Sequence, residues 1–137
     1  MEPKLIFWPV LAQVALTIFM FFRLAIVKAR SLRAGDVDLS RRALHADAWP
    51  DYVLQVTNNV RNQFEMPVLF YVIALGLWAL GEVDAATLTL AWSYVAFRVV
   101  HAYIHTGSNI VKYRLKVFQL STLALLGLLA FAVRAMI

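Results

Sequence analysis

The chain has 137 residues, of which 62% are hydrophobic and only 15% charged, and its mean hydropathy is +0.71. A soluble domain of this length needs far more polar surface, so the composition indicates a single membrane-embedded domain. The formal net charge is +5, and the sequence contains no cysteine. Disulfides, thiolate metal sites and a cysteine nucleophile are therefore excluded.

Four apolar segments follow one another along the chain. A transmembrane helix needs about 20 largely apolar residues. The predicted spans are residues 5–27, 52–80, 84–106 and 114–135. We therefore expect an all-α fold, an integral membrane four-helix bundle formed by one domain over residues 1–137. The first span lacks a small-residue cleavage site, so it is expected to be a membrane anchor rather than a removed signal peptide.

The connection 28–50 is the only segment with the composition of a soluble linker. Gly35 and Asp36 offer turn chemistry within it. The following stretch "HADAWPDY" predicts a helix start, with Asp47 near the cap and Pro50 in the first turn.

Basic residues are concentrated on one side of the predicted bundle, in the connections 28–51 and 107–116. The opposite side carries only Lys4 and Arg134. The positive-inside rule places the basic connections in the cytoplasm and both termini on the non-cytoplasmic side. The net charge then reflects topology and contact with anionic lipids. A nucleic-acid partner is not expected, because it needs a basic patch on a soluble surface.

Two polar stripes run along otherwise apolar spans. In the second span, four side chains share one helical face by their spacing: Gln55, Asn58, Asn62 and Glu65. In the third span, four more share a face: Tyr94, Arg98, His101 and His105. Polar stripes on apolar helices face one another or a water-filled cavity rather than lipid.

An ionised Glu65 within the membrane needs a cation, and Arg98 is the expected partner. Arg61 can also reach Glu65 at i+4 on a continuous helix. Pro67 lacks an N–H, so the carbonyl of Gln63 loses its helical partner beside this cluster. Two interpretations of the Glu65–Arg98 pair stay open: a structural ion pair between helices, or a pair that binds a ligand.

His101 and His105 extend the same polar face towards the cytoplasmic end. A lone histidine in a span is more often a buried core residue. His101 shares a face with Arg98 and His105, which favours a role in binding. A proton or ion carrier along this stripe is disfavoured, since one short bundle offers no continuous polar path to the other side. No metal site is predicted.

The segments "RNQFEMPVLFY" and "FRVVHAYIHTGSNIVKYR" carry a family resemblance. The first has the order Arg-Asn-x-x-Glu followed by proline, and the second has Arg-x-x-His, a following glycine and an arginine at the start of the last span. Together with the four-span layout, they resemble the MAPEG family (membrane-associated proteins in eicosanoid and glutathione metabolism), in a bacterial-type member. The resemblance covers nearly the whole chain.

This resemblance implies a homotrimer in the bacterial inner membrane, with glutathione as co-substrate between neighbouring subunits and a lipophilic small-molecule substrate reaching it from the lipid. Arg114 matches the arginine that stabilises the glutathione thiolate, and is the implied catalytic residue. A free thiol has a pKa of about 8.5, and a nearby guanidinium favours its anion. The implied glutathione-binding residues are Asn58, Arg61, Asn62, Glu65, Arg98, His101 and His105.

The chain also departs from the family pattern. Asn58 stands where an arginine is usual, and His105 and Phe118 stand where tyrosines are common. The family's first-helix arginine corresponds to Lys28 or Arg30, which the differing loop lengths leave unaligned.

Two functions follow. One is a membrane glutathione transferase or peroxidase acting on lipophilic electrophiles or lipid hydroperoxides. The other is a non-catalytic lipid- or partner-binding protein on the same scaffold.

Overall fold

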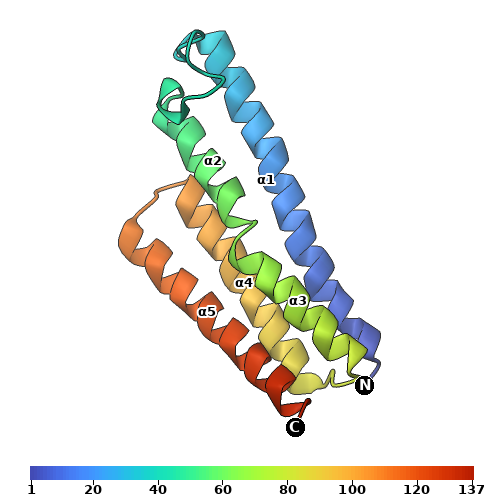
Figure 1. Cartoon of the computed structure of the whole chain (residues 1–137). Coiled ribbons are helices and arrows are strands. Elements are labelled where there is room, and N and C mark those ends of the chain that lie inside the picture. Colours follow the sequence, from blue (N-terminus) through green and yellow to red (C-terminus); the bar gives the residue numbers. More distant parts are fainter.

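The computed structural model describes residues 1–137 as five α-helices, with no strand. Two short 3-10 turns, Pro3–Ile6 and Ala46–Ala48, lie before the first and second helices. α2 and α3 follow one another along one leg, so the bundle has four legs, with both termini at the same end (Figure 1). The α-helices are α1 Phe7–Ala34, α2 Asp51–Asn62, α3 Met66–Ala79, α4 Ala85–Thr106 and α5 Val111–Arg134. The predicted all-α class is confirmed.

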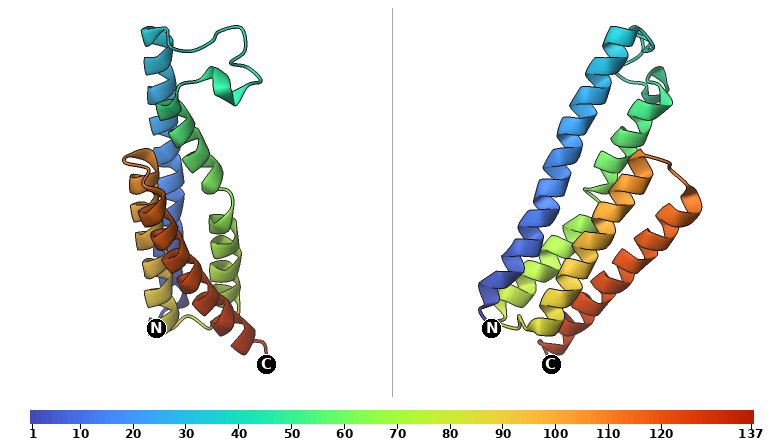
Figure 2. Two further views of the ribbon diagram at one scale, coloured as in Figure 1. Left: turned by 90° about the vertical axis from the view of Figure 1, so that its left-hand side faces the viewer. Right: turned by 180° about the vertical axis from the view of Figure 1, so that it is seen from behind.

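Two helices are individually long and apolar enough to cross a membrane: Pro3–Ala34, which joins the first 3-10 turn to α1, and α5. α2 and α3 have 12 and 14 residues, and each is shorter than the roughly 20 residues that a span requires. Only in tandem do they reach that length. α1 and the beginning of α2 extend beyond the end of α4 (Figures 1 and 2).

The prediction of one continuous helix over 52–80 is wrong, because α2 ends at Asn62 and α3 begins at Met66. Between them, Glu65 has φ −100° and ψ −104°, outside the helical region. Pro67 lies in the first turn of α3. It offers no N–H and its ring clashes with the carbonyl four residues earlier, so the chain leaves the helix and restarts it. The proline therefore breaks the helix, where the sequence predicted only one lost hydrogen bond.

The main apolar core lies at the end of the bundle that holds the termini. Phe70 on α3 stacks on Tyr94 of α4 with ring centroids 4.5 Å apart, and both side chains are fully buried. α4 starts here with a capping box, in which Thr87 N–H donates to the Asp84 carboxylate at 2.8 Å. The remaining core residues come from the N-terminal 3-10 turn, the start of α1, the α3–α4 connection and α3, α4 and α5: Ile6, Val10, Ala74, Leu77, Val83, Ala91, Val95, Ala124, Leu125 and Leu128.

The connection between α1 and α2 folds back over the opposite end of the bundle. Gly35 ends α1 with φ +71°, a left-handed conformation that glycine adopts without strain. Asp36 then accepts hydrogen bonds from Ser31 Oγ and from Tyr52 Oη. These bonds lower the pKa of the Asp36 carboxyl, that from Ser31 most. One aspartate thus ties the end of α1 to the start of α2.

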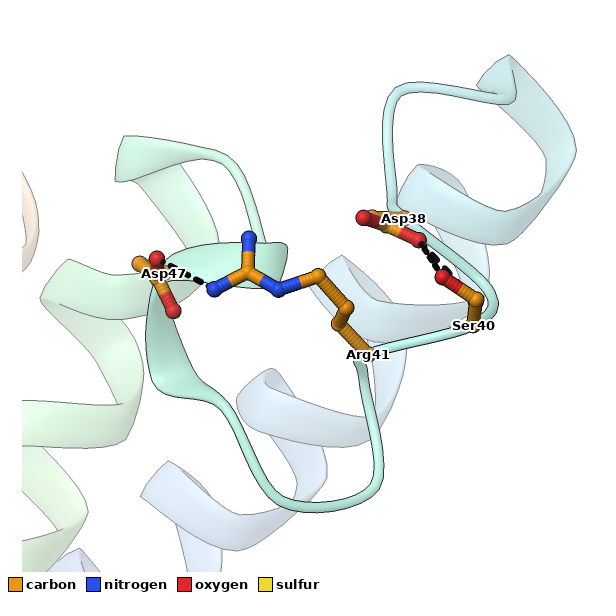
Figure 3. Close-up of polar contacts among 4 residues, drawn as sticks. All are labelled: Asp38, Ser40, Arg41 and Asp47. Carbon is orange, nitrogen blue, oxygen red and sulfur yellow. Dashed lines mark hydrogen bonds and ion pairs between the residues drawn. The ribbon is translucent and has the colours of Figure 1, made fainter.

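The helix start predicted with Asp47 near the cap and Pro50 in the first turn is displaced along the chain. Pro50 occupies the N-cap position of α2, and Asp47 lies in the preceding 3-10 turn. Its carboxylate accepts from Arg41 Nη2 at 2.8 Å, while Asp38 accepts from Ser40 nearby (Figure 3). The hydrogen bond from Arg41 lowers the pKa of Asp47. Pro50 has φ −67° and ψ 160°, an extended conformation before the helix, and Asp47 contacts Arg41 of the loop instead.

Candidate functional site

A pocket of about 410 Å³ lies between α2, the helix break, α4 and the first turns of α5. Its polar lining comes from α2, the helix break, α4 and α5, and its apolar lining comes from α5 alone. The lining residues are Asn58, Asn62, Glu65, His101, His105, Val111, Arg114, Leu115 and Phe118.

A second recess of about 270 Å³ adjoins this pocket. The two share Asn58, His105 and Arg114, so they form one continuous cavity along α2. The second recess adds Gln55, the first member of the polar stripe predicted on the second span, and Asp51 from the start of α2. From Asp51 to Asn62, the combined cavity follows about three turns of α2.

Arg114 projects into the cavity from the first turn of α5. Its Nη1 donates to Asn109 Oδ1 at 2.6 Å, and Asn109 lies in the short α4–α5 connection with φ +52°. Asparagine is one of the few residues that adopt such a left-handed conformation readily. No carboxylate forms an ion pair with Arg114. The guanidinium is therefore held in position with its charge available to a ligand.

Glu65 lies across the cavity from Arg114, in the helix break. It is exposed to the cavity and forms neither an ion pair nor a side-chain hydrogen bond. As the N-cap residue of α3 it stands at the positive end of that helix, where a carboxylate is favoured. The cavity thus has an unpaired anion on one wall and an unpaired cation on the other.

The predicted ion pairs of Glu65 with Arg98 and with Arg61 do not form. The helix break displaces Glu65 from the turn above Arg61, so the i+4 relation that would bring them together is lost. Arg61 is exposed and does not line the cavity. Arg98 is completely buried behind the cavity wall.

Arg98 instead forms a hydrogen bond with the C-terminal end of α2. Its Nη2 donates to the backbone carbonyl of Asn62 at 3.2 Å, one of the carbonyls that the end of α2 leaves without a helical partner. Its Nε and Nη1 have no protein partner. Arg98 therefore supports the wall that carries Asn62 rather than reaching a ligand directly.

His101 and His105 are both buried on α4, with ring centroids 5.5 Å apart. His101 packs against Phe118, with ring centroids 5.9 Å apart. The amide nitrogens of Asn59 and Asn62 each lie 3.4 Å from His105 Nδ1. Both imidazoles thus form the floor of the cavity between its polar and apolar walls.

The two basic residues considered for the first helix both stay outside the cavity. Lys28 Nζ lies 4.9 Å from the Trp49 ring centroid and the Arg30 guanidinium 5.3 Å from that of Tyr52. Neither of them lines the cavity. No cluster of three or more His, Cys, Asp or Glu side chains forms that could hold a metal ion.

One wall of the site and one buried amide behind it were not predicted from the sequence. The apolar wall of Val111, Leu115 and Phe118 resembles ordinary lipid-facing sequence. The buried amide of Gln13 on α1 was the more visible omission, because it is the only amide in the first predicted span. A polar side chain inside a span is by default part of a polar cluster.

A helical bundle with helices of membrane-spanning length and a polar cavity between them is the architecture of an integral membrane protein. The model of the MAPEG family matches residues 6–134, so the chain belongs to this family of membrane-associated helical bundles. The resemblance seen in the sequence is thereby confirmed. Searches of curated proteins and of solved structures gave no match.

Proposed function

We propose that this protein is a membrane-bound glutathione transferase or peroxidase acting on lipophilic electrophiles or lipid hydroperoxides. The observation that supports it best is the pair of unpaired charges across the cavity, Glu65 and Arg114. Glutathione carries an ammonium group, two carboxylates and a thiol. It therefore offers a cation to Glu65 and anions to Arg114, while Asn58 and Asn62 can bond its amide groups.

Arg114 is the proposed catalytic residue. A guanidinium beside the glutathione sulfur lowers the pKa of the thiol and raises the concentration of the thiolate, which is the nucleophile. In conjugation, the thiolate sulfur forms a bond to an electrophilic carbon and the leaving group departs with its electron pair. In peroxide reduction, the thiolate attacks the terminal oxygen, the O–O bond breaks and the alkoxide takes a proton. A second glutathione then reduces the sulfenic acid, giving a disulfide and water.

The apolar wall provides the route for the second substrate. Val111 and Leu115 are exposed on α5, and Phe118 closes the inner part of the wall. A lipophilic molecule dissolved in the bilayer can reach the thiolate along this side of α5 without crossing water. This arrangement explains why the chemistry would be located in a membrane.

We further propose the assembly that the family implies, a homotrimer in the bacterial inner membrane with glutathione bound between neighbouring subunits. The orientation that the basic connections predict places both termini on the non-cytoplasmic side. The N-terminal half of α5 supports this assembly, since none of its residues before Ser121 is buried in the protomer. A neighbouring subunit would cover the open side of the cavity.

A non-catalytic lipid- or partner-binding protein is the second candidate. Arg114 is the only lysine or arginine that lines either recess, whereas glutathione has two carboxylates. A charge-assisted hydrogen bond contributes roughly 1.5–3 kcal/mol, and Asn58 cannot supply one as an arginine would. This deficit favours a ligand with a single anionic group.

Titration with glutathione separates the two candidates. A ligand that binds only the folded state raises the unfolding temperature by mass action. Purified protein in detergent is heated with increasing glutathione, and glycyl-glycine serves as a control without the γ-glutamyl and thiol groups. A rise with millimolar glutathione supports the transferase, and an unchanged unfolding temperature contradicts it.

Substitution of Arg114 tests the catalytic assignment. Arg114→Ala should lower conjugation of a chlorodinitrobenzene by roughly a hundredfold, the usual effect of losing one group that stabilises developing negative charge. Lys112→Ala, an exposed cation in the same turn, should keep full activity. Size-exclusion chromatography checks that both variants keep their oligomeric state, and retained turnover in Arg114→Ala would refute the assignment.

A further inference from the structure

Three buried amides form a hydrogen-bonded chain across the bundle, from α1 to α4. Gln13 Nε2 donates to Gln63 Oε1 at 3.0 Å, and Gln63 Nε2 donates to Asn59 Oδ1 at 3.0 Å. Asn59 Nδ2 then lies 3.4 Å from His105 Nδ1. The three amide side chains, named the amide relay here, are at most 1% exposed. None of them lines the cavity, yet the relay ends on a residue that does.

The relay has a direction. Each amide after the first accepts through its oxygen from the preceding residue and donates through its nitrogen to the next. An amide NH₂ group can only donate, so the His105 Nδ1 that faces Asn59 must accept. A second amide nitrogen, that of Asn62, approaches the same Nδ1 at 3.4 Å. Both amide nitrogens that approach the ring therefore favour the same acceptor role for Nδ1.

A neutral imidazole that accepts at Nδ1 carries its hydrogen at Nε2. His105 Nε2 has no hydrogen-bond partner in the protein and is not among the buried unpartnered atoms, so it opens on the cavity that the ring lines. We infer that the amide relay holds His105 as its Nε2–H tautomer, which makes His105 a fixed hydrogen-bond donor to an acceptor oxygen of the bound ligand.

Gln13, Gln63 and Asn59 are then positioning residues, and His105 is the residue that touches the ligand. Burial keeps the relay in place, because each amide released from its partner would leave a polar group unsatisfied at about 1–3 kcal/mol. The tautomer itself does not depend on what the cavity binds. The nature of the acceptor, a carboxylate or peptide carbonyl oxygen, rests on the proposed function.

Nitrogen NMR of protein labelled with ¹⁵N-histidine measures the tautomer directly, without added thiol. The chain has three histidines, and loss of one pair of signals in His105→Gln assigns those of His105. The expected pattern is a protonated Nε2 and an unprotonated Nδ1. A protonated Nδ1, or equal populations of the two tautomers, would overturn the inference. The tautomer is measured in the unaltered protein, so the outcome does not depend on whether a variant of the relay folds.

Reversal of the relay's last link gives the second test. In Asn59→Asp, a carboxylate accepts both from Gln63 and from the ring, so the hydrogen of His105 should move to Nδ1 or the ring should become doubly protonated. Gln119→Glu, the same kind of change at an exposed amide of α5, should leave the pattern unaltered. An unchanged Nε2–H tautomer in a folded Asn59→Asp protein contradicts control by the relay.

Addition of millimolar glutathione distinguishes failure of this inference from failure of the proposed function. Binding at His105 should move the Nε2–H resonance downfield while the unfolding temperature rises. If the unfolding temperature rises and the resonance does not move, His105 is not a ligand donor, although glutathione binds. If neither changes, the transferase proposal fails, whereas the tautomer measured without thiol still stands.

Discussion

The two halves of α5 differ in what surrounds them. From Ser121 onwards the helix buries Ala124, Leu125 and Leu128 in the apolar core near the termini. Before Ser121 it buries no residue, and its side chains border the cavity that holds Arg114. The same helix therefore packs as part of a bundle in one half and stands as the wall of a site in the other.

The segment formed by α2 and α3 is likewise divided into a packed half and a half that lines the cavity. α3 packs its Phe70 into the apolar core, while α2 carries Asn58 and Asn62 on the cavity. The break around Glu65 separates these halves. The larger apolar core lies in the half that holds the termini, and a smaller core of Met20, Val56, Val60 and Ala102 packs in the half that holds the cavity. Substitutions in the larger core should therefore affect stability with little direct effect on the cavity lining.

The largest expected effect on stability comes from the apolar half. Phe70→Ala removes a fully buried ring stacked on Tyr94 and should lower the free energy of unfolding by about 3–5 kcal/mol. Val72→Ala on the same helix, where the side chain is 65% exposed, should have little effect. Thermal unfolding in detergent measures both. Equal losses in the two variants would mean that this core does not hold the bundle together.

The next largest effect, on glutathione affinity, is expected from a substitution at the helix break between α2 and α3. Pro67→Ala restores an N–H that the Gln63 carbonyl can accept, so α2 and α3 should merge and Glu65 should turn out of the cavity. The affinity for glutathione should fall about tenfold, or 1.4 kcal/mol, without loss of thermal stability. The glutathione-dependent rise in unfolding temperature gives the affinity.

Pro9→Ala is the matched control for that change, because Pro9 lies in the first turn of α1, where a proline interrupts no helical hydrogen bond. It should leave the affinity unaltered. Undiminished glutathione binding in Pro67→Ala would mean that the break does not place Glu65.

The smallest effect is expected in the loop beyond the site. Asp36→Ala removes the acceptor that joins Ser31 to Tyr52 and should lower the unfolding temperature slightly at neutral pH. Asp38→Ala removes only the hydrogen bonds from the backbone N–H and the hydroxyl of Ser40, two residues away, and should lower the unfolding temperature less. The pKa of folded Asp36 is lowered by these hydrogen bonds, so its contribution is complete above the unfolded pKa of about 3.9.

The contribution of Asp36 is lost as the pH falls through its lowered folded value. The difference in unfolding temperature between Asp36→Ala and the unaltered protein should therefore shrink below a pH of about 4. Unfolding curves recorded from neutral to acidic pH follow it. A gap that stays constant would show that the Asp36 hydrogen bonds are no stronger than those of the unfolded chain.

Several elements were predictable because they depend on local composition. Hydropathy predicted an all-α fold, and helical spacing placed Asn58, Asn62 and Glu65 on one face of their segment. The same spacing placed His101 and His105 together on α4. Arg114 followed from the resemblance to the family. The structure brings all six side chains to one cavity.

Other features depend on packing between segments far apart in the chain. Arg98 was expected to neutralise Glu65, but it lies behind the wall and bonds the end of α2. The amide relay joins Gln13 to Gln63, fifty positions apart. No pattern within one segment specifies such a partner.

The sequence by itself thus determined the number of legs, the apolar faces and the polar residues of the site, because periodicity and hydropathy act within a single segment. The tertiary structure decided which charges remain unpaired and which way His105 presents its nitrogens. Those properties depend on the helix break at Pro67 and on atoms from α1, α2, α4 and α5 that only folding brings within hydrogen-bonding distance.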